Sequence, residues 1–340
     1  MVASIDTLPK AELHAHLEDS ISPDIIRKLA ERNKVKLPDH IIGPDNDFIY
    51  TDFLDFLRVT DVVNECIRTE QDYYEITYHY LQQAARQGVI YQEIMPSPDH
   101  ARVAGLSYKA MLDAVADAVH AAHKDFGITA CIWITCVRQF GIEACTRVAE
   151  DIVANPHPLV RGFGMAGDEA GFPPKQFAKV FHIARDAGLL CTVHAGEHTG
   201  PEGIWDAIDG LPVCRIGHGV RAIEDAKLVA TLVERNIALE VCPCSNVKLK
   251  VYPDFASHPL KALLDAGVKV TLNADDPPFF STSIGNEYQV AHDAFGLDVA
   301  TLLEITRNAI NAGFIEPAKK AQLLAQVDAY HENGTADTVA

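Results

Sequence analysis

The sequence lacks long apolar runs, clusters of basic residues and an export signal. No apolar stretch approaches the ~20 residues that a membrane-spanning helix needs, and the N-terminus MVASIDTLPKAELH has no signal-peptide core. The chain carries 47 acidic against 29 basic residues, a formal net charge of −18. We therefore expect no membrane insertion and no nucleic-acid binding, and we expect a cytoplasmic location.

Cysteine is present but lacks the spacing of a structural zinc site. Of the eight cysteines, Cys242 and Cys244 are separated by one residue, and no second pair exists elsewhere. A metal pair at these two positions is one reading, but we favour buried, reduced thiols that serve packing.

What the sequence does contain is a series of short apolar runs, each followed by a helical pattern. The runs are apolar throughout, as parallel strands covered on both faces should be. Strand–helix alternation repeated eight times predicts an α/β fold, a (β/α)8 or TIM barrel. The eight predicted strands are 12–17, 89–96, 128–136, 160–167, 189–196, 215–220, 237–246 and 268–275.

The spacing between the first two strands is too long for one helix. Residues 21–70 contain at least two helical patterns, and we expect this insertion to fold over the barrel mouth as a lid. Residues 1–332 are predicted to form a single metal-dependent hydrolase domain, and the polar segment 333–340 a flexible tail.

Polar residues recur at the carboxyl ends of the predicted strands, where barrel enzymes place their catalytic groups. His14 and His16 are two residues apart, so on a strand both point into the barrel. With His194 and Asp275 they supply three nitrogens and one oxygen and leave a position for water, as a catalytic zinc requires. The alternative is a set of hydrogen-bonded core histidines.

One metal ion is favoured over two. The fourth predicted strand ends in GFGMAGDE, which contains no lysine of the kind that bridges two ions. We therefore expect one Zn²⁺, or a similar divalent metal, per chain.

Two further residues stand beside the predicted metal site. His218 is flanked by glycines, and its imidazole could take the proton of an activated water or orient it. Glu197 follows His194 by three residues, and a carboxyl group in an apolar pocket can carry a proton to donate. Its alternative role is that of a carboxylate at a helix N-terminus. Ser245 and Asn246 are polar residues at the end of the seventh strand.

These residues occur together in segments that resemble the adenosine deaminase family. The matching segments follow the family order from residue 8 to about 288. Each is weak alone, but the ordered set is specific. They read LPKAELHAHLE, GFGMAGDEAGFPP, TVHAGEHTGPEGIWDAI, RIGHGV, CPCSN followed by HPLKALLDAG, and VTLNADDPPFF.

The resemblance implies roles for individual residues. The family's zinc ligands match His14, His16, His194 and Asp275. Glu197 matches the residue that protonates purine N1, and His218 the histidine beside the reacting water. Asp276 matches the carboxyl group that meets N7, and the backbone N–H of Gly167 the donor to N3. The implied reaction is hydrolytic deamination at C6 with release of ammonia.

The sequence departs from the family at the sugar end of the site. Glu18 stands where adenosine-specific members usually carry an aspartate that touches the ribose, and Asp19 where glycine is common. Glutamate at this position also occurs in adenine deaminases. Against that, the AGDE of 166–169 is the adenosine-type form.

From the sequence we expect an enzyme that converts adenosine or deoxyadenosine to inosine or deoxyinosine. The alternatives are an adenine deaminase, which makes hypoxanthine, and a deaminase of a modified nucleoside such as 6-aminodeoxyfutalosine. A catalytically silent nucleoside-binding barrel would lack a ligand or Glu197, and both are present. A hydrolase of amides or phosphate esters is disfavoured by the missing lysine. The expected partner is a small purine, and no feature of the sequence indicates an oligomeric state.

Overall fold

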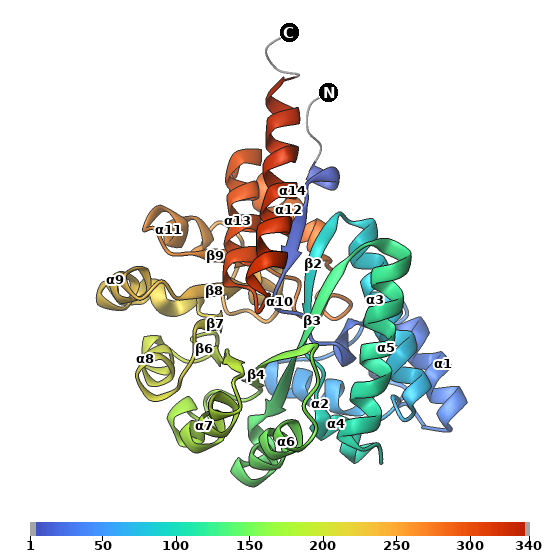
Figure 1. Cartoon of the computed structure of the whole chain (residues 1–340). Coiled ribbons are helices and arrows are strands. Elements are labelled where there is room, and N and C mark those ends of the chain that lie inside the picture. Colours follow the sequence, from blue (N-terminus) through green and yellow to red (C-terminus); the bar gives the residue numbers. More distant parts are fainter. Residues whose placement is uncertain (1–4, 337–340) are drawn as a thin grey trace.

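The computed structural model describes residues 5–336, and it consists of a central ring of parallel strands surrounded by helices (Figure 1). All strand pairs are parallel. Hydrogen bonds join the strands into two sets, β1 to β5 and β6 to β9. The strands are β1 (Lys10–Glu12), β2 (Val89–Ile94), β3 (Thr129–Val137), β4 (Val160–Ala166), β5 (Leu190–Cys191), β6 (His194–Ala195), β7 (Arg215–His218), β8 (Ala238–Val241) and β9 (Val270–Leu272).

The two sets of strands are joined at both ends, so the sheet closes on itself. At one junction β5 and β6 are the two halves of the single strand predicted over 189–196, and the Cys214 N–H donates to the Cys191 carbonyl at 3.0 Å. At the other junction Ala15 pairs with Asp275, and the His16 N–H donates to the Asp275 carbonyl at 3.1 Å. The predicted (β/α)8 barrel is confirmed.

Helices cover the outside of the barrel. Two of the long helices, α3 and α5, begin at N-terminal caps that are visible in the sequence. Thr69 and Asp72 form a capping box for α3, and the Ser107 hydroxyl accepts from the Ala110 N–H in α5. Among the described residues no helix is long and apolar enough to cross a membrane. The helices that follow the insertion are α3 (Glu70–Arg86), α4 (Pro98–Val103), α5 (Tyr108–Phe126), α6 (Ile142–Ala154), α7 (Ala178–Asp186), α8 (Pro201–Gly210), α9 (Ala226–Glu234), α10 (Pro243–Lys248), α11 (Leu260–Asp265), α12 (Ile284–Asp293), α13 (Val299–Ala312) and α14 (Pro317–Ala336).

The described residues also contain five short 3₁₀ helices. They are η1 (Ile5–Thr7), η2 (Glu18–Ser20), η3 (Arg138–Phe140), η4 (Pro174–Phe177) and η5 (Val220–Glu224). The predicted tail begins inside α14, which continues to Ala336. The remainder of that tail, 337–340, lies outside the described residues.

The insertion at 21–70 contains α1 (Pro23–Asn33) and α2 (Phe53–Asn64). An aromatic contact ties α2 to the loop after β9, because the Phe56 ring packs edge-on against Phe279 with centroids 5.5 Å apart. The Tyr50 hydroxyl also donates to the Phe279 carbonyl at 2.9 Å. The insertion therefore covers the carboxyl end of the barrel, and its action as a lid remains a prediction.

The glycines of β4 make room for large side chains inside the barrel. A Cβ atom on Gly164 would lie 2.2 Å from the ring of Trp133, and one on Gly162 would lie 2.3 Å from the ring of Phe314. Trp133 is fully buried and donates from Nε1 to the Leu13 carbonyl at 3.1 Å. This bond holds the segment that leads into His14, so packing of the barrel interior helps to position the site.

Candidate active site

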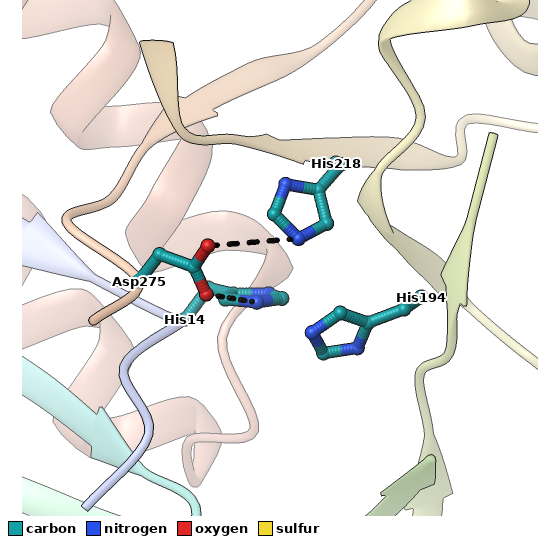
Figure 2. Close-up of side chains that lie close together, drawn as sticks. All are labelled: His14, His194, His218 and Asp275. Atoms are coloured by element: carbon teal, nitrogen blue, oxygen red, sulfur yellow. Dashed lines mark ion pairs between the residues drawn. The ribbon is translucent and has the colours of Figure 1, made fainter. Parts of the chain in front are cut away.

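Three histidines and an aspartate converge at the carboxyl end of the barrel (Figure 2). His14, His194, His218 and Asp275 are buried and each offers one ligand atom, all within 4.8 Å of one another. The dashed lines mark the contacts of Asp275 with His14 Nε2 at 3.3 Å and with His218 Nε2 at 3.9 Å.

His16 joins this group from the side of the pocket. Its Nε2 atom lies 3.2 Å from His194 Nε2 and 3.4 Å from Asp275 Oδ1. The four predicted metal ligands are thus together, with His218 as their immediate neighbour.

The backbone at two of these positions adopts a conformation that L-residues avoid. His218 ends β7 with a φ of +56°, and Asp275 follows β9 with a φ of +63°. Such left-handed backbone at a non-glycine residue costs energy and is concentrated at functional sites. Here it turns both side chains from the strand ends toward the same point.

The outer ring nitrogens of two histidines are already occupied. His14 Nδ1 donates to Glu240 Oε2 at 2.7 Å, and His194 Nδ1 donates to the Met165 carbonyl at 3.1 Å. Each bond fixes the proton on Nδ1 and leaves a lone pair on Nε2, which is the arrangement of metal-binding histidines.

The charges of this group favour a cation at its centre. Burial lowers the pKa of His16 to about 4 and holds that of His194 well below its usual value, so both rings are neutral. Burial would also lower the pKa of His14, but the neighbouring Asp275 and Glu240 carboxylates raise it to about 9, so the negative charge around this ring favours a positive charge at its position. His14 Nε2 is buried and makes no hydrogen bond of good geometry. Three imidazole nitrogens and one carboxylate oxygen suit a divalent metal such as zinc.

Glu197 lies on the turn beyond β6, next to His218. Its Oε2 atom is 3.6 Å from His218 Nε2. Burial raises its pKa well above the usual range, and the Asp275 and Glu169 carboxylates raise it further. Glu169 also accepts from the backbone N–H of Glu197 at 3.3 Å and so anchors the turn. Glu197 is therefore a buried carboxyl group suited to carrying a proton.

The other predicted site residues line the same pocket. Asp276 and Asp19 come within 4.8 Å of each other and of His16, and the Oδ1 atom of each is buried without a hydrogen-bond partner. Gly167 also lines this pocket, and its φ is +103°. L side chains rarely adopt this backbone conformation, and a Cβ atom there would also lie 1.9 Å from Gln139 Oε1, so the position favours glycine.

Glu18 lines the same pocket and is held there by two hydrogen bonds. Its Oε1 atom accepts from the Tyr73 hydroxyl at 3.2 Å and from the Ser97 N–H at 2.9 Å. Asp61 of α2 and His100 of α4 meet beside it at 3.0 Å. The space inside this pocket is small, about 70 Å³.

Sequence reasoning missed several residues that support the site. Glu240 holds His14, and Arg138, which is fully buried, donates to the His194 carbonyl at 2.6 Å. A charged residue inside the apolar run IALEVC was the available signal for Glu240. Ser245 and Asn246 lie in α10 rather than at a strand end, and the Ser245 hydroxyl donates to Asp275 Oδ2 at 2.7 Å.

Known proteins resemble the chain over almost its whole length. The family model described as adenosine deaminase matches residues 9–330. An adenine deaminase from Agrobacterium fabrum is 45% identical over 320 residues, which cover 94% of this chain and 98% of that protein. The crystal structure of an adenine deaminase from Arthrobacter aurescens superposes with a TM-score of 0.89 at 32% identity, covering 96% of this chain and 99% of that one.

A zinc-bound amidohydrolase from Burkholderia ambifaria superposes with a TM-score of 0.87 at 26% identity, covering 98% of this chain and 94% of that one. The order of the motifs, the closed barrel and these similarities agree. The chain belongs to the adenosine deaminase family of hydrolases, which cleave a carbon–nitrogen bond.

Proposed function

We propose that this protein is a zinc-dependent adenine deaminase, which hydrolyses the free base at C6 to hypoxanthine and ammonia. The observation that carries the choice of substrate is Glu18, which is buried and held on two sides at the end of the pocket where a ribose would lie. The similarity to adenine deaminases at 45% and 32% identity supports the same choice. This substrate was the alternative to adenosine at the sequence level.

The metal would be held by His14, His16, His194 and Asp275, because their free ligand atoms face one point and the outer nitrogens of His14 and His194 are occupied. When bound, zinc supplies one piece of chemistry: it lowers the pKa of a water to about 7, so that a nucleophile is present at neutral pH.

Glu197 supplies the proton that makes the purine ring reactive. It donates to N1 as the water oxygen forms its bond to C6, which gives a tetrahedral carbon carrying both oxygen and the amino group. The Glu197 carboxylate then moves the hydroxyl proton to the amino nitrogen, the C6–N bond breaks, and ammonia leaves. The proton released when the water ionised restores Glu197. A general acid of this kind contributes about 10²–10⁴-fold.

The remaining pocket groups orient the base. Asp276 has a buried, unpartnered oxygen and is assigned to N7. The Gly167 backbone is assigned to N3, at a position where a side chain would collide with Gln139. Burial raises the pKa of Asp276 well above its usual value, as do Asp275 and Asp19, so this carboxyl group carries a proton that it can donate to N7.

The pocket is less suited to a nucleoside. Hydrogen bonds from Tyr73 and Ser97 keep the Glu18 side chain in place. Burial raises the pKa of Glu18. A ribose would have to displace Glu18 or separate Asp61 from His100. Separating that pair would break its 3.0 Å hydrogen bond, which links α2 to α4 beside the pocket.

The test is to measure the turnover of adenine, adenosine, deoxyadenosine and 6-aminodeoxyfutalosine by zinc-loaded protein, followed by ultraviolet absorbance. We expect kcat/KM for adenine to exceed that for each nucleoside by about 10²-fold or more. A nucleoside that is used better than adenine would overturn the assignment.

A matched pair of variants tests the role of Glu18. Glu18→Asp shortens the side chain and should raise the use of adenosine relative to adenine, whereas Glu18→Gln keeps its length and should not. An equal response to both substitutions would mean that side-chain length at this position does not set the substrate.

A further inference from the structure

Behind His218, on the side away from the pocket, lies a chain of three buried hydrogen bonds. The Leu260 backbone N–H donates to His258 Nδ1 at 3.2 Å. His258 Nε2 lies 3.1 Å from Asn246 Oδ1, and Asn246 Nδ2 lies 3.4 Å from His218 Nδ1. The Asn246 side chain is completely buried, and His258 is 5% exposed.

The direction of this chain follows from its backbone end. A backbone amide can only donate, so His258 Nδ1 accepts and the proton of the neutral ring is on Nε2. That proton is donated to the Asn246 oxygen, which fixes the orientation of the amide. The amide NH₂ group then faces His218 Nδ1, which must accept. The proton of a neutral His218 is therefore on Nε2.

The surroundings keep His258 neutral and in place. Its ring packs edge-on against Tyr252 and Phe295, with centroids 5.2 and 5.6 Å away. Burial lowers the pKa of His258 to about 4, so it carries no charge at neutral pH. The bond to Leu260 spans only Pro259, whose ring restricts the backbone between donor and acceptor.

We propose that Asn246 and His258 are positioning residues that hold His218 in the tautomer with its proton on Nε2. This inference rests on the proposed function, since it concerns the role of His218 in deamination. In this tautomer His218 presents an N–H to the reaction site, where its Nε2 lies 3.6 Å from Glu197 Oε2 and 3.9 Å from Asp275 Oδ2.

The sequence left two roles open for His218, taking the proton of the water or orienting it, and the tautomer decides between them. A neutral imidazole with its proton on Nε2 has its lone pair on Nδ1, directed at Asn246. Its Nε2 atom can donate to the oxygen that attacks C6 and to the negative charge that develops there, but it cannot take the proton of the water. His218 therefore orients and stabilises the attacking oxygen.

Asn246→Asp is the most direct variant, because it keeps the shape of the side chain. A carboxylate only accepts, so it would draw the His218 proton to Nδ1 and turn the lone pair of Nε2 toward the site. We expect kcat for adenine to fall about 10²–10⁴-fold with KM little changed and zinc content retained.

The position of the His218 ring proton is a measurement that a purely structural role of Asn246 and His258 would not change. Nitrogen NMR of ¹⁵N-histidine-labelled, zinc-loaded protein distinguishes protonated from unprotonated ring nitrogens, and the His218 signals are identified by their loss in His218→Asn. We expect the proton on Nε2 in the wild type and on Nδ1 in Asn246→Asp.

His258 provides an independent pair of variants. His258→Ala leaves the Asn246 oxygen without a donor and should lower kcat, whereas His258→Gln offers both an acceptor and a donor and should recover most of the loss. Tyr252→Phe keeps the ring beside His258 and serves as the packing control. Its kcat should match that of the wild type.

A wild-type His218 with its proton on Nδ1 would overturn the inference, and so would an Asn246→Asp protein with unchanged tautomer and turnover. The wild-type spectrum alone decides the tautomer, even if a variant does not fold. If the protein does not deaminate adenine but the proton is on Nε2, the proposed function fails while the assigned tautomer stands.

Discussion

Glu197 and Asp275 are buried carboxyl groups whose environments push their pKa values in opposite directions. Burial would raise the pKa of Asp275, but the His218 and His14 rings lower it below its ordinary value. Glu197 has two carboxylates, Asp275 and Glu169, among its neighbours, and its pKa is raised. Pairs of carboxyl groups separated in this way are typical of sites that need one proton donor and one ionised ligand.

Replacing Glu197 by glutamine tests this division. Glu197→Gln should lower kcat for adenine by about 10²–10⁴-fold, since the amide cannot supply the proton. Zinc content measured by elemental analysis should stay unchanged. Glu202→Gln, in which an exposed carboxylate on α8 is neutralised, serves as the control. Turnover that survives in Glu197→Gln would mean that another group is the acid.

The residues that the sequence could reveal are those whose chemistry is visible in a short motif. His14, His16, His194 and Asp275 stand at strand ends, where their side chains have no packing reason to be. His258 has no such signal, because its partner Asn246 is meaningful only once α10 brings it behind His218. Arg138 likewise acts through a bond to the carbonyl of His194, 56 residues later in the chain.

At the scale of elements, α2 connects the insertion to both sides of the pocket. Phe53 lies against His198, with ring centroids 3.7 Å apart, and Phe56 packs against the loop that follows Asp276. Movement of α2 would therefore open the pocket and loosen the loop that carries Asp276.

Phe53→Ala should weaken this attachment without removing a core residue. The lost ring contact corresponds to about 0.5–1.5 kcal/mol, so KM for adenine should rise roughly twofold to tenfold, and hydrogen exchange of α2 should become faster. Leu54→Ala alters a half-exposed neighbour on the same helix and should leave both measurements unchanged. A normal KM in Phe53→Ala would argue against α2 as a lid.

A second link between elements depends on the pH. Glu287 of α12 is fully buried, accepts from the Thr282 hydroxyl at 2.7 Å, and accepts from the Cys244 N–H of α10 at 3.3 Å. Burial raises its pKa from 4.5 to about 7, although these hydrogen bonds oppose the shift. Between those pH values the folded protein holds a proton that the unfolded chain has lost.

This proton stabilises the fold fully below about pH 4.5, and the stabilisation is lost as the pH rises through about 7. The contribution is on the order of 3 kcal/mol. The Tm difference between the wild type and Glu287→Gln should therefore favour the wild type at pH 5 and shift toward the variant by pH 8. Glu304→Gln, at an exposed carboxylate, should track the wild type at every pH. A pH-independent difference for Glu287→Gln would contradict the assigned proton.

The sequence predicted which strands exist better than where they end. The strand predicted over 12–17 lies instead at Lys10–Glu12 and shares only Glu12 with the prediction, and the one predicted over 268–275 is regular only over Val270–Leu272. The ladders stop early because the backbone turns to direct side chains inward, as the positive φ of His218 and Asp275 shows. Apolar patterning does not record such turns.

At the scale of the whole molecule, the barrel closes at the site. The pairing of Ala15 with Asp275 joins the first and last strands, and His14, His16 and Asp275 lie on either side of that junction. Removing one of these proposed ligands should therefore affect metal binding and stability together.

His16→Ala should lose bound zinc, as measured by elemental analysis after dialysis. In the wild type, free zinc at 100 times its Kd should add about 2.7 kcal/mol of stability, and the chelated protein should melt at a lower temperature. His16→Ala should show no comparable rise in Tm with zinc. His182→Ala, on the outer helix α7, should behave like the wild type. Full zinc content in His16→Ala would exclude it as a ligand.

The closure between Ala15 and Asp275 also sets an order of events during synthesis of the chain. When His194 leaves the ribosome, all three proposed histidine ligands have been made, but Asp275, the carboxylate of the proposed set, is still 81 residues away. A nascent chain can therefore expose these imidazoles to metal ions in solution before the closed barrel can form around a bound ion. With this ligand set, a complete metal site can form only after residue 275 has emerged and the first strand meets the last.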